Sequence, residues 1–177
     1  MNELLISRYQ NLAAYSRWAN RRLYVAAAAL SDTQYRADRG AFFGSVHGTL
    51  NHLLVTDRIW MRRITGMGEA PDRLDAILFD TLPELETARY LEDVRIVDFV
   101  GTLSGWVLRA DLHYSNSSGQ KFHQPLANVL DHLFNHQTHH RGQVHCLLSG
   151  FLGNAATPSL DLIQFQRETG LARTEAT

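Results

Sequence analysis

Apolar side chains recur at three- and four-residue steps in several long stretches of the chain, and this spacing is typical of amphipathic helices. The four longest stretches cover about residues 3–30, 45–65, 81–104 and 126–151. Residues 110–124 instead alternate apolar and polar positions around an Asn-Ser-Ser-Gly turn, which predicts a small β-hairpin. A last short helix is predicted to begin near residues 157–159.

Capping signals support several of these boundaries. Ser45 is a fair N-cap for the second helix, and Gly66 and Gly68 are predicted to end it. Residues 31–34 are Ser-Asp-Thr-Gln and predict a capping box that starts a short extra turn. Residues 81–84, Thr-Leu-Pro-Glu, predict a second capping box at the start of the third helix.

These elements predict an all-α fold: an antiparallel four-helix bundle with a small β-hairpin between its third and fourth helices and a short C-terminal helix. We expect one domain over residues 1–170, followed by a C-terminal tail over residues 171–177. The second helix is apolar around most of its circumference, so it is predicted to pack on two sides, one of which could contact a dimer partner. Bundles of this kind hold ligand and metal sites between facing helices.

Composition narrows the class of protein. The formal net charge of -1 leaves no basic surface for nucleic acid or anionic membrane, so we expect neither as a partner. The single cysteine, Cys146, excludes an intramolecular disulfide, and it is predicted to be a small packed side chain. Neither a secretion signal nor a membrane span is evident in the sequence, and we therefore expect a cytoplasmic protein.

Residues 135–145, NHQTHHRGQVH, contain four of the nine histidines. At about 100° per residue, His140 lies near the centre of the apolar stripe of this helix and His136 at its edge. Two histidines at positions i and i+4 of one helix have the spacing with which such pairs share a metal ion. Two buried imidazoles without partners would cost on the order of a few kcal/mol, which a shared ion would remove. His136 and His140 are therefore predicted metal ligands.

The other histidines of this helix are assigned lesser roles. His132 and His139 lie at the border of the stripe, where they are predicted to line the site or to support the ligands. His145 lies on the opposite side and is predicted to be solvated. The alternative to a metal site is a plain helical bundle whose histidines are satisfied by hydrogen bonds.

A third ligand must come from another helix. The second helix offers His52 beside its apolar stripe, Asp57 within it and His47 on its other flank. Helical geometry does not choose between His52 and Asp57. Asp57 could instead accept the outer N–H of a ligating imidazole, which would fix its tautomer. It could equally form a salt bridge with a nearby arginine.

Four stretches of the sequence form a recognisable series. They are, in order, YSRWAN (15–20), HGTLNHLLVTDRIW (47–60), NHQTHHRGQVH (135–145) and PSLDLIQF (158–165). Together they resemble the DinB family of metalloenzymes, which is related to YfiT-like proteins and mycothiol-dependent isomerases. The resemblance implies a four-helix bundle, usually a homodimer, in which three histidines bind a divalent ion. Matched residue by residue, those ligands are His52, His136 and His140.

Three nitrogen ligands with an open position indicate a catalytic rather than a structural ion, and imidazole suits Zn, Ni or Fe. Asp57, His139 and Gln143 lie near the ligands on the helical wheels and are the candidate catalytic residues. The sequence thus predicts a metal-dependent transferase or hydrolase that acts on a small molecule. The resemblance adds a low-molecular-weight thiol, such as bacillithiol or mycothiol, as a second cofactor. The alternative is a non-catalytic, metal-binding stress-response bundle.

Overall fold

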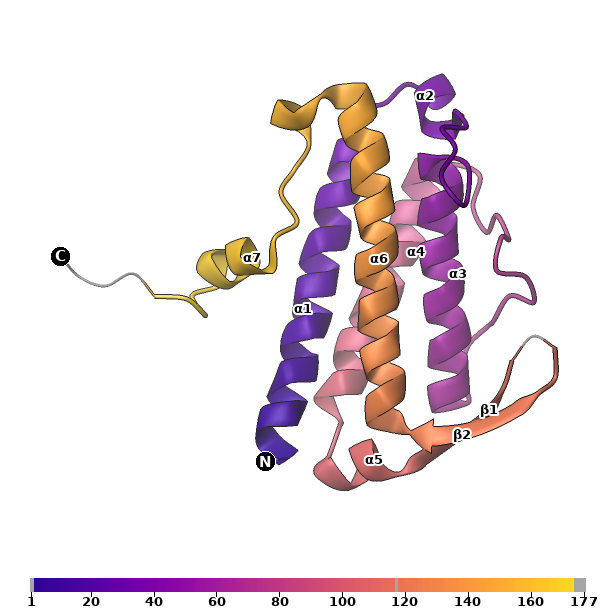
Figure 1. Cartoon of the computed structure of the whole chain (residues 1–177), viewed down its shortest axis with the longest axis vertical. Helices are drawn as coiled ribbons and strands as arrows, with labels where there is room; N and C mark the ends of the chain where they lie inside the picture. The colour runs from indigo at the N-terminus through magenta and orange to yellow at the C-terminus, as the bar shows by residue number, and fades with distance from the viewer. Residues whose placement is uncertain (1, 117, 174–177) are drawn as a thin grey trace.

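The computed structural model describes residues 2–116 and 118–173, which form a bundle of four long helices (Figure 1). The long helices are α1 (Asn2–Ala27), α3 (Val46–Thr65), α4 (Leu82–Gly101) and α6 (Leu126–Leu152). The shorter elements are α2 (Asp32–Arg36), α5 (Gly105–Arg109), the 3₁₀ helix η1 (Asn154–Ala156), α7 (Leu162–Glu168) and the antiparallel strands β1 (Asp111–Ser115) and β2 (Lys121–Pro125). The predicted all-α bundle with one hairpin and a short C-terminal helix is confirmed.

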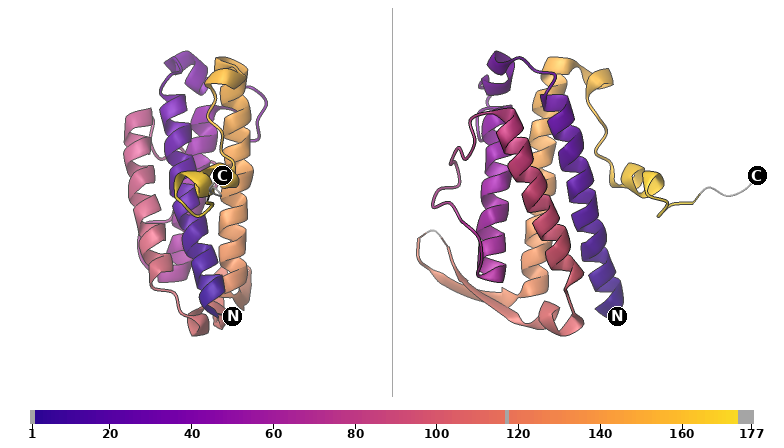
Figure 2. Two further views of the ribbon diagram at one scale, coloured as in Figure 1. Left: turned by 90° about the vertical axis from the view of Figure 1, so that its left-hand side faces the viewer. Right: turned by 180° about the vertical axis from the view of Figure 1, so that it is seen from behind.

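The four long helices do not simply alternate in direction. In Figures 1 and 2, α1 and α6 rise from the end of the bundle that carries the N-terminus, whereas α3 and α4 descend toward it. Both α1 and α3 pack against α4 and α6. The predicted antiparallel arrangement therefore holds for α1 with α4 and for α3 with α6, while α3 and α4 run parallel, as do α1 and α6.

The connection over residues 66–81 makes the parallel pair possible, because it climbs back along the outside of α3 (Figure 1). Asn51 of α3 holds it: its side-chain oxygen accepts from the backbone N–H groups of Leu78 and Phe79, at 2.8 and 3.1 Å. The carbonyl oxygen of Phe79 accepts in turn from the Asn51 amide and from His47. This return path brings backbone carbonyl groups beside the middle of α3.

Several predicted helix ends are confirmed. Ser31 and Gln34 form the capping box of α2, the Ser45 hydroxyl accepts from the backbone N–H of Gly48, and Gly66 ends α3 in the left-handed conformation with φ 73°. Such a backbone is nearly free of strain for glycine alone.

Several boundaries differ from the prediction. The first long helix ends at Ala27, and the C-terminal helix α7 begins only at Leu162. The Thr81 hydroxyl donates to the Glu84 carboxylate at 2.6 Å and caps no backbone N–H, so the second capping box does not form. The third long helix ends at Gly101, because Ser104 begins the separate helix α5 by accepting from the backbone N–H of Val107.

Apolar side chains fill the bundle in two main clusters, one at each end, around Leu50 and Leu54 and around Leu130 and Leu133. Among the described helices, none has both the length and the apolar character needed to cross a membrane.

A charged network lies between α3, α4 and α6 in the core. The Arg89 guanidinium contacts the carboxylates of Asp57, at 2.6 Å, and Asp93, at 3.0 Å. Gln137 of α6 also donates to Asp57, and Asn20 of α1 donates to Asp93. Arg89 is 2% and Asp57 0% exposed, so each charge depends on its partner for compensation.

Arg141 of α6 extends this network. It is 1% exposed, donates to the side-chain oxygen of Gln137 at 3.0 Å and lies over the ring of Tyr15. The network thus ties α6 to α3 and α4 directly beside His136.

We predict that Arg89→Met lowers the free energy of unfolding by about 3–5 kcal/mol, because it leaves the buried carboxylates without a cation. Asp57→Asn in the same background should recover part of that loss. The surface variant Arg36→Met, which breaks exposed pairs with Asp32 and Asp80, should cost far less, because water screens these charges. Urea unfolding measures all three, and an Arg89→Met loss no larger than that of Arg36→Met would contradict the prediction.

Candidate metal site

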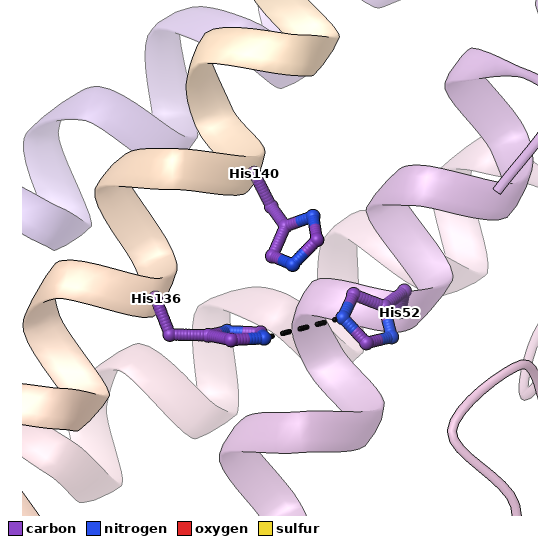
Figure 3. A group of neighbouring side chains, drawn as sticks. All are labelled: His52, His136 and His140. Atoms are coloured by element: carbon purple, nitrogen blue, oxygen red, sulfur yellow. Dashed lines mark hydrogen bonds between the residues drawn. The ribbon is translucent and has the colours of Figure 1, made fainter. Parts of the chain in front are cut away.

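Three histidines from two helices meet near the middle of the antiparallel pair α3 and α6. His52 comes from α3, and His136 and His140 lie one turn apart on α6 (Figure 3). Each offers one ring nitrogen, and the three nitrogens lie within 4.8 Å of one another. His52 is 3% and His140 7% exposed, and His136 is half-buried. The structure therefore brings together the three residues that the resemblance implied, whereas helical geometry alone had left His52 and Asp57 open.

His52 is held by the return connection. Its Nδ1 donates to the carbonyl oxygen of Leu74 at 2.7 Å. A carbonyl oxygen can only accept, so the proton of the neutral ring lies on Nδ1 and Nε2 keeps its lone pair. Phe43 stacks on the face of the ring, with the centroids 3.6 Å apart. The orientation and the tautomer of His52 are both set before any ligand binds.

His140 is held in the same way by a residue of its own helix. Its Nδ1 donates to the Gln143 side-chain oxygen at 2.8 Å, which leaves a lone pair on Nε2. The amide nitrogen of Gln143 then donates to Nε2 of His139 at 3.2 Å. Two predicted catalytic residues, His139 and Gln143, are thus connected to a candidate ligand, as expected for groups that support a metal site.

His136 completes the cluster. Its Nε2 lies 3.3 Å from Nε2 of His52, and because the latter nitrogen has only a lone pair, the hydrogen between them belongs to His136 (Figure 3). A divalent cation could take the place of that hydrogen once the hydrogen has moved to Nδ1 of His136, and the three Nε2 lone pairs would then all face the ion. The donor set therefore fits the ion that the family resemblance implies.

The electrostatics favour neutral rings, which is the form that binds a metal. Burial lowers the pKa of His52 to about 4. Burial, together with the neighbouring histidines, lowers the pKa of His136 to about 3. Burial also lowers the pKa of His140. Near neutral pH all three imidazoles are therefore neutral. An ion can bind without first displacing a proton from an imidazolium ring.

Phe43 belongs to the loop 37–44, for which the sequence offered no functional signal. The loop can reach His52 because Gly48 has no side chain: a Cβ there would overlap the carbonyl oxygen of Phe43. Phe43 also approaches His140, with the ring centroids 5.6 Å apart. Phe43 thus covers one side of the cluster with an aromatic ring.

Asp57, the third predicted catalytic residue, lies outside the histidine cluster. Its contacts are with Arg89 and Gln137, and burial raises its pKa to about 6. Of the three roles considered from the sequence, the contacts match the salt bridge to an arginine. Gln137, which sequence reasoning missed, directly follows His136 in the chain and donates to Asp57, so it connects Asp57 to the part of α6 that carries His136.

Four other residues of α6 were assigned roles from the sequence. His132 and His139 are exposed at the edge of the cluster, with their rings 5.7 Å from His136 and 4.7 Å from His140. The predicted solvation of His145 is wrong, because this residue is half-buried and hydrogen-bonds the carbonyl oxygen of Pro158 at 3.0 Å. The prediction that Cys146 is packed is also wrong, since its side chain is exposed.

The fold and the site define a helical-bundle protein with a three-histidine cluster between facing helices. The model of the DinB family matches residues 1–169, nearly the whole chain, so the chain belongs to the DinB family. A comparison with curated proteins found no match.

We predict that metal binding at pH 6 releases fewer than about one proton, because the lowered pKa values leave the ligating rings unprotonated. Three histidines with an ordinary pKa near 6.5 would release about two protons at this pH. Calorimetric titration with ZnCl₂ in two buffers that differ in ionisation enthalpy measures the number. Release of about two protons would contradict the neutral cluster, and His113→Ala on the hairpin should leave the result unchanged.

Proposed function

We propose that the protein is a divalent-metal-dependent enzyme that acts on a small molecule, as a thiol-dependent transferase or as a hydrolase. The observation that supports this most strongly is the set of three converging imidazoles, two of which have their outer nitrogen anchored. Within the described residues, no carboxylate or thiol joins this group as a fourth ligand. Three protein ligands with a free position are typical of catalytic rather than structural sites.

Zn, Ni or Fe suits three imidazole ligands, and the donor set alone does not choose among them. When bound, such an ion would lower the pKa of a coordinated water to about 7 or hold a substrate thiolate in its reactive form. His52, His136 and His140 would hold it, with the Leu74 carbonyl and the Gln143 amide fixing the direction of two of the rings.

His139 is the residue best placed to move a proton. It is exposed at the edge of the cluster, and the amide N–H of Gln143 donates to its Nε2, so the hydrogen of the neutral ring lies on Nδ1. His139 would donate or accept a proton at the reacting group. Gln143 would position both His139 and His140.

Asp57 contributes at a distance in this proposal. Its carboxylate accepts from the side chain of Gln137 and is itself paired with the buried Arg89. We assign it the role of a positioning residue for the segment of α6 that carries His136.

The experiment is an activity screen on protein loaded in turn with Zn, Ni and Fe(II). The probes are p-nitrophenyl acetate for hydrolysis and 1-chloro-2,4-dinitrobenzene with glutathione or bacillithiol for transfer, in which a C–S bond forms and chloride leaves. We expect metal-dependent turnover in at least one assay. His139→Ala should reduce kcat by about 10²-fold or more while the metal content stays unchanged.

The control is His113→Ala, which removes an exposed histidine of the hairpin and should leave kcat unchanged. Metal retention with no turnover on any probe would instead favour the alternative, a non-catalytic metal-binding bundle. Turnover that is independent of metal, or equal in wild type and His139→Ala, would contradict the roles assigned here.

The homodimer, the cytoplasmic location and the division between residues 1–170 and 171–177 stay predictions. Residues 174–177 of the predicted tail lie outside the described residues.

A further inference from the structure

Aromatic rings continue from the histidine cluster along the seam between α3 and α6. The ring of His132 lies 5.7 Å from that of His136, and the ring of Trp60 lies 5.1 Å from that of His132. Tyr114 of the hairpin follows, 5.2 Å from Trp60. We call Trp60, Tyr114 and His132 the aromatic strip. Trp60 and Tyr114 are half-buried and His132 is exposed, so the strip borders solvent.

Arg63 lies over the far end of the strip. Its guanidinium carbon is 4.6 Å from the centre of the Trp60 ring and 5.3 Å from that of Tyr114. The residue is half-buried, and burial lowers its pKa. In the described part of the chain no Asp or Glu pairs with Arg63, whereas Arg89 and Arg95 each contact a carboxylate.

The hairpin supplies the wall that holds this arginine. It extends outward from the lower end of the bundle beneath α3 (Figure 1). Tyr114 of β1 is paired with Phe122 of β2, and their rings stack 5.6 Å apart. The partial burial of Arg63 against these rings therefore depends on a hairpin that adds little to the helical core.

We propose that Arg63 and the aromatic strip form an anion-binding subsite that recognises a carboxylate or phosphate group of the small molecule processed at the three histidines. A guanidinium is built to bind either group through paired N–H donors, and its stacking on Trp60 orients that donor edge in advance. The apolar body of the substrate would lie on Trp60 and His132, which lead to His136. This assignment rests on the proposed function.

The test uses metal-free protein, so that an added anion cannot bind an ion at the histidines. The indole N–H signal of Trp60, assigned with Trp60→Phe, is followed by NMR during titration with 3-phenylpropionate, phenyl phosphate and the neutral 3-phenylpropionamide. At least one anion should bind about tenfold or more tightly than the amide, because the bond to the guanidinium is charge-assisted. The tighter of the two anions identifies the group that the subsite prefers.

Arg63→Met should abolish the preference for the anion, and the neighbouring Arg62→Met, whose guanidinium donates to the Gly68 carbonyl, should keep it. Arg63→Lys keeps the charge without the flat donor edge and should retain part of the preference. Equal binding of anions and amide, or an unchanged preference in Arg63→Met, would overturn the proposal.

A second measurement tests whether the subsite serves the histidine site. In cobalt-loaded protein, the protons of the bound anion should relax faster than in zinc-loaded protein, because the paramagnetic ion is near. Binding without this enhancement would overturn the connection to the site. Failure of cobalt to bind would contradict the proposed function and leave the result of the metal-free titration standing, so the two failures are distinguishable.

Discussion

The constraint on which the site depends is the burial of three imidazoles against one another. Such burial keeps each ring neutral. A neutral imidazole has one donor nitrogen and one acceptor nitrogen, and both need a partner when they are buried. The Leu74 carbonyl accepts from His52, and the Gln143 amide accepts from His140. Both lone pairs are thereby turned toward the centre of the cluster, where the lone pair of His52 accepts from the N–H of His136. A divalent ion satisfies this arrangement better than a single shared hydrogen does.

The path of the chain serves the same constraint. A four-helix bundle with three short connections would place no connecting backbone carbonyl beside the middle of α3. Here the long connection over residues 66–81 returns along α3, which gives the bundle its parallel pairs and supplies the carbonyl of Leu74 (Figures 1 and 2). Gly48 admits Phe43 from the loop 37–44 that precedes α3. The partners of His52 thus come from two irregular segments, while α3 and α6 supply the ligands.

Periodicity was sufficient to predict the long helices and to place His136 and His140 on the buried face of α6, because a helix repeats its orientation every few residues. It could not decide between His52 and Asp57, since both are buried on α3 and the difference lies in Arg89 on another helix. Family resemblance selected His52. Phe43, Leu74 and Gln137 were missed because no local pattern connects them to a histidine. His145 was misjudged because its partner, the Pro158 carbonyl, lies in a segment whose path no periodicity predicts.

The most direct measurement of the central claim is the metal content of protein purified without a histidine tag, by inductively coupled plasma mass spectrometry. Wild type is compared with His136→Ala/His140→Ala and with His113→Ala/His123→Ala, which removes two stacked histidines of the hairpin. The account predicts about one equivalent of Zn, Ni or Fe in the wild type and in the hairpin variant, and none in the α6 variant. Absence of metal from the wild type after incubation with divalent ions, or its retention in the α6 variant, would contradict the account.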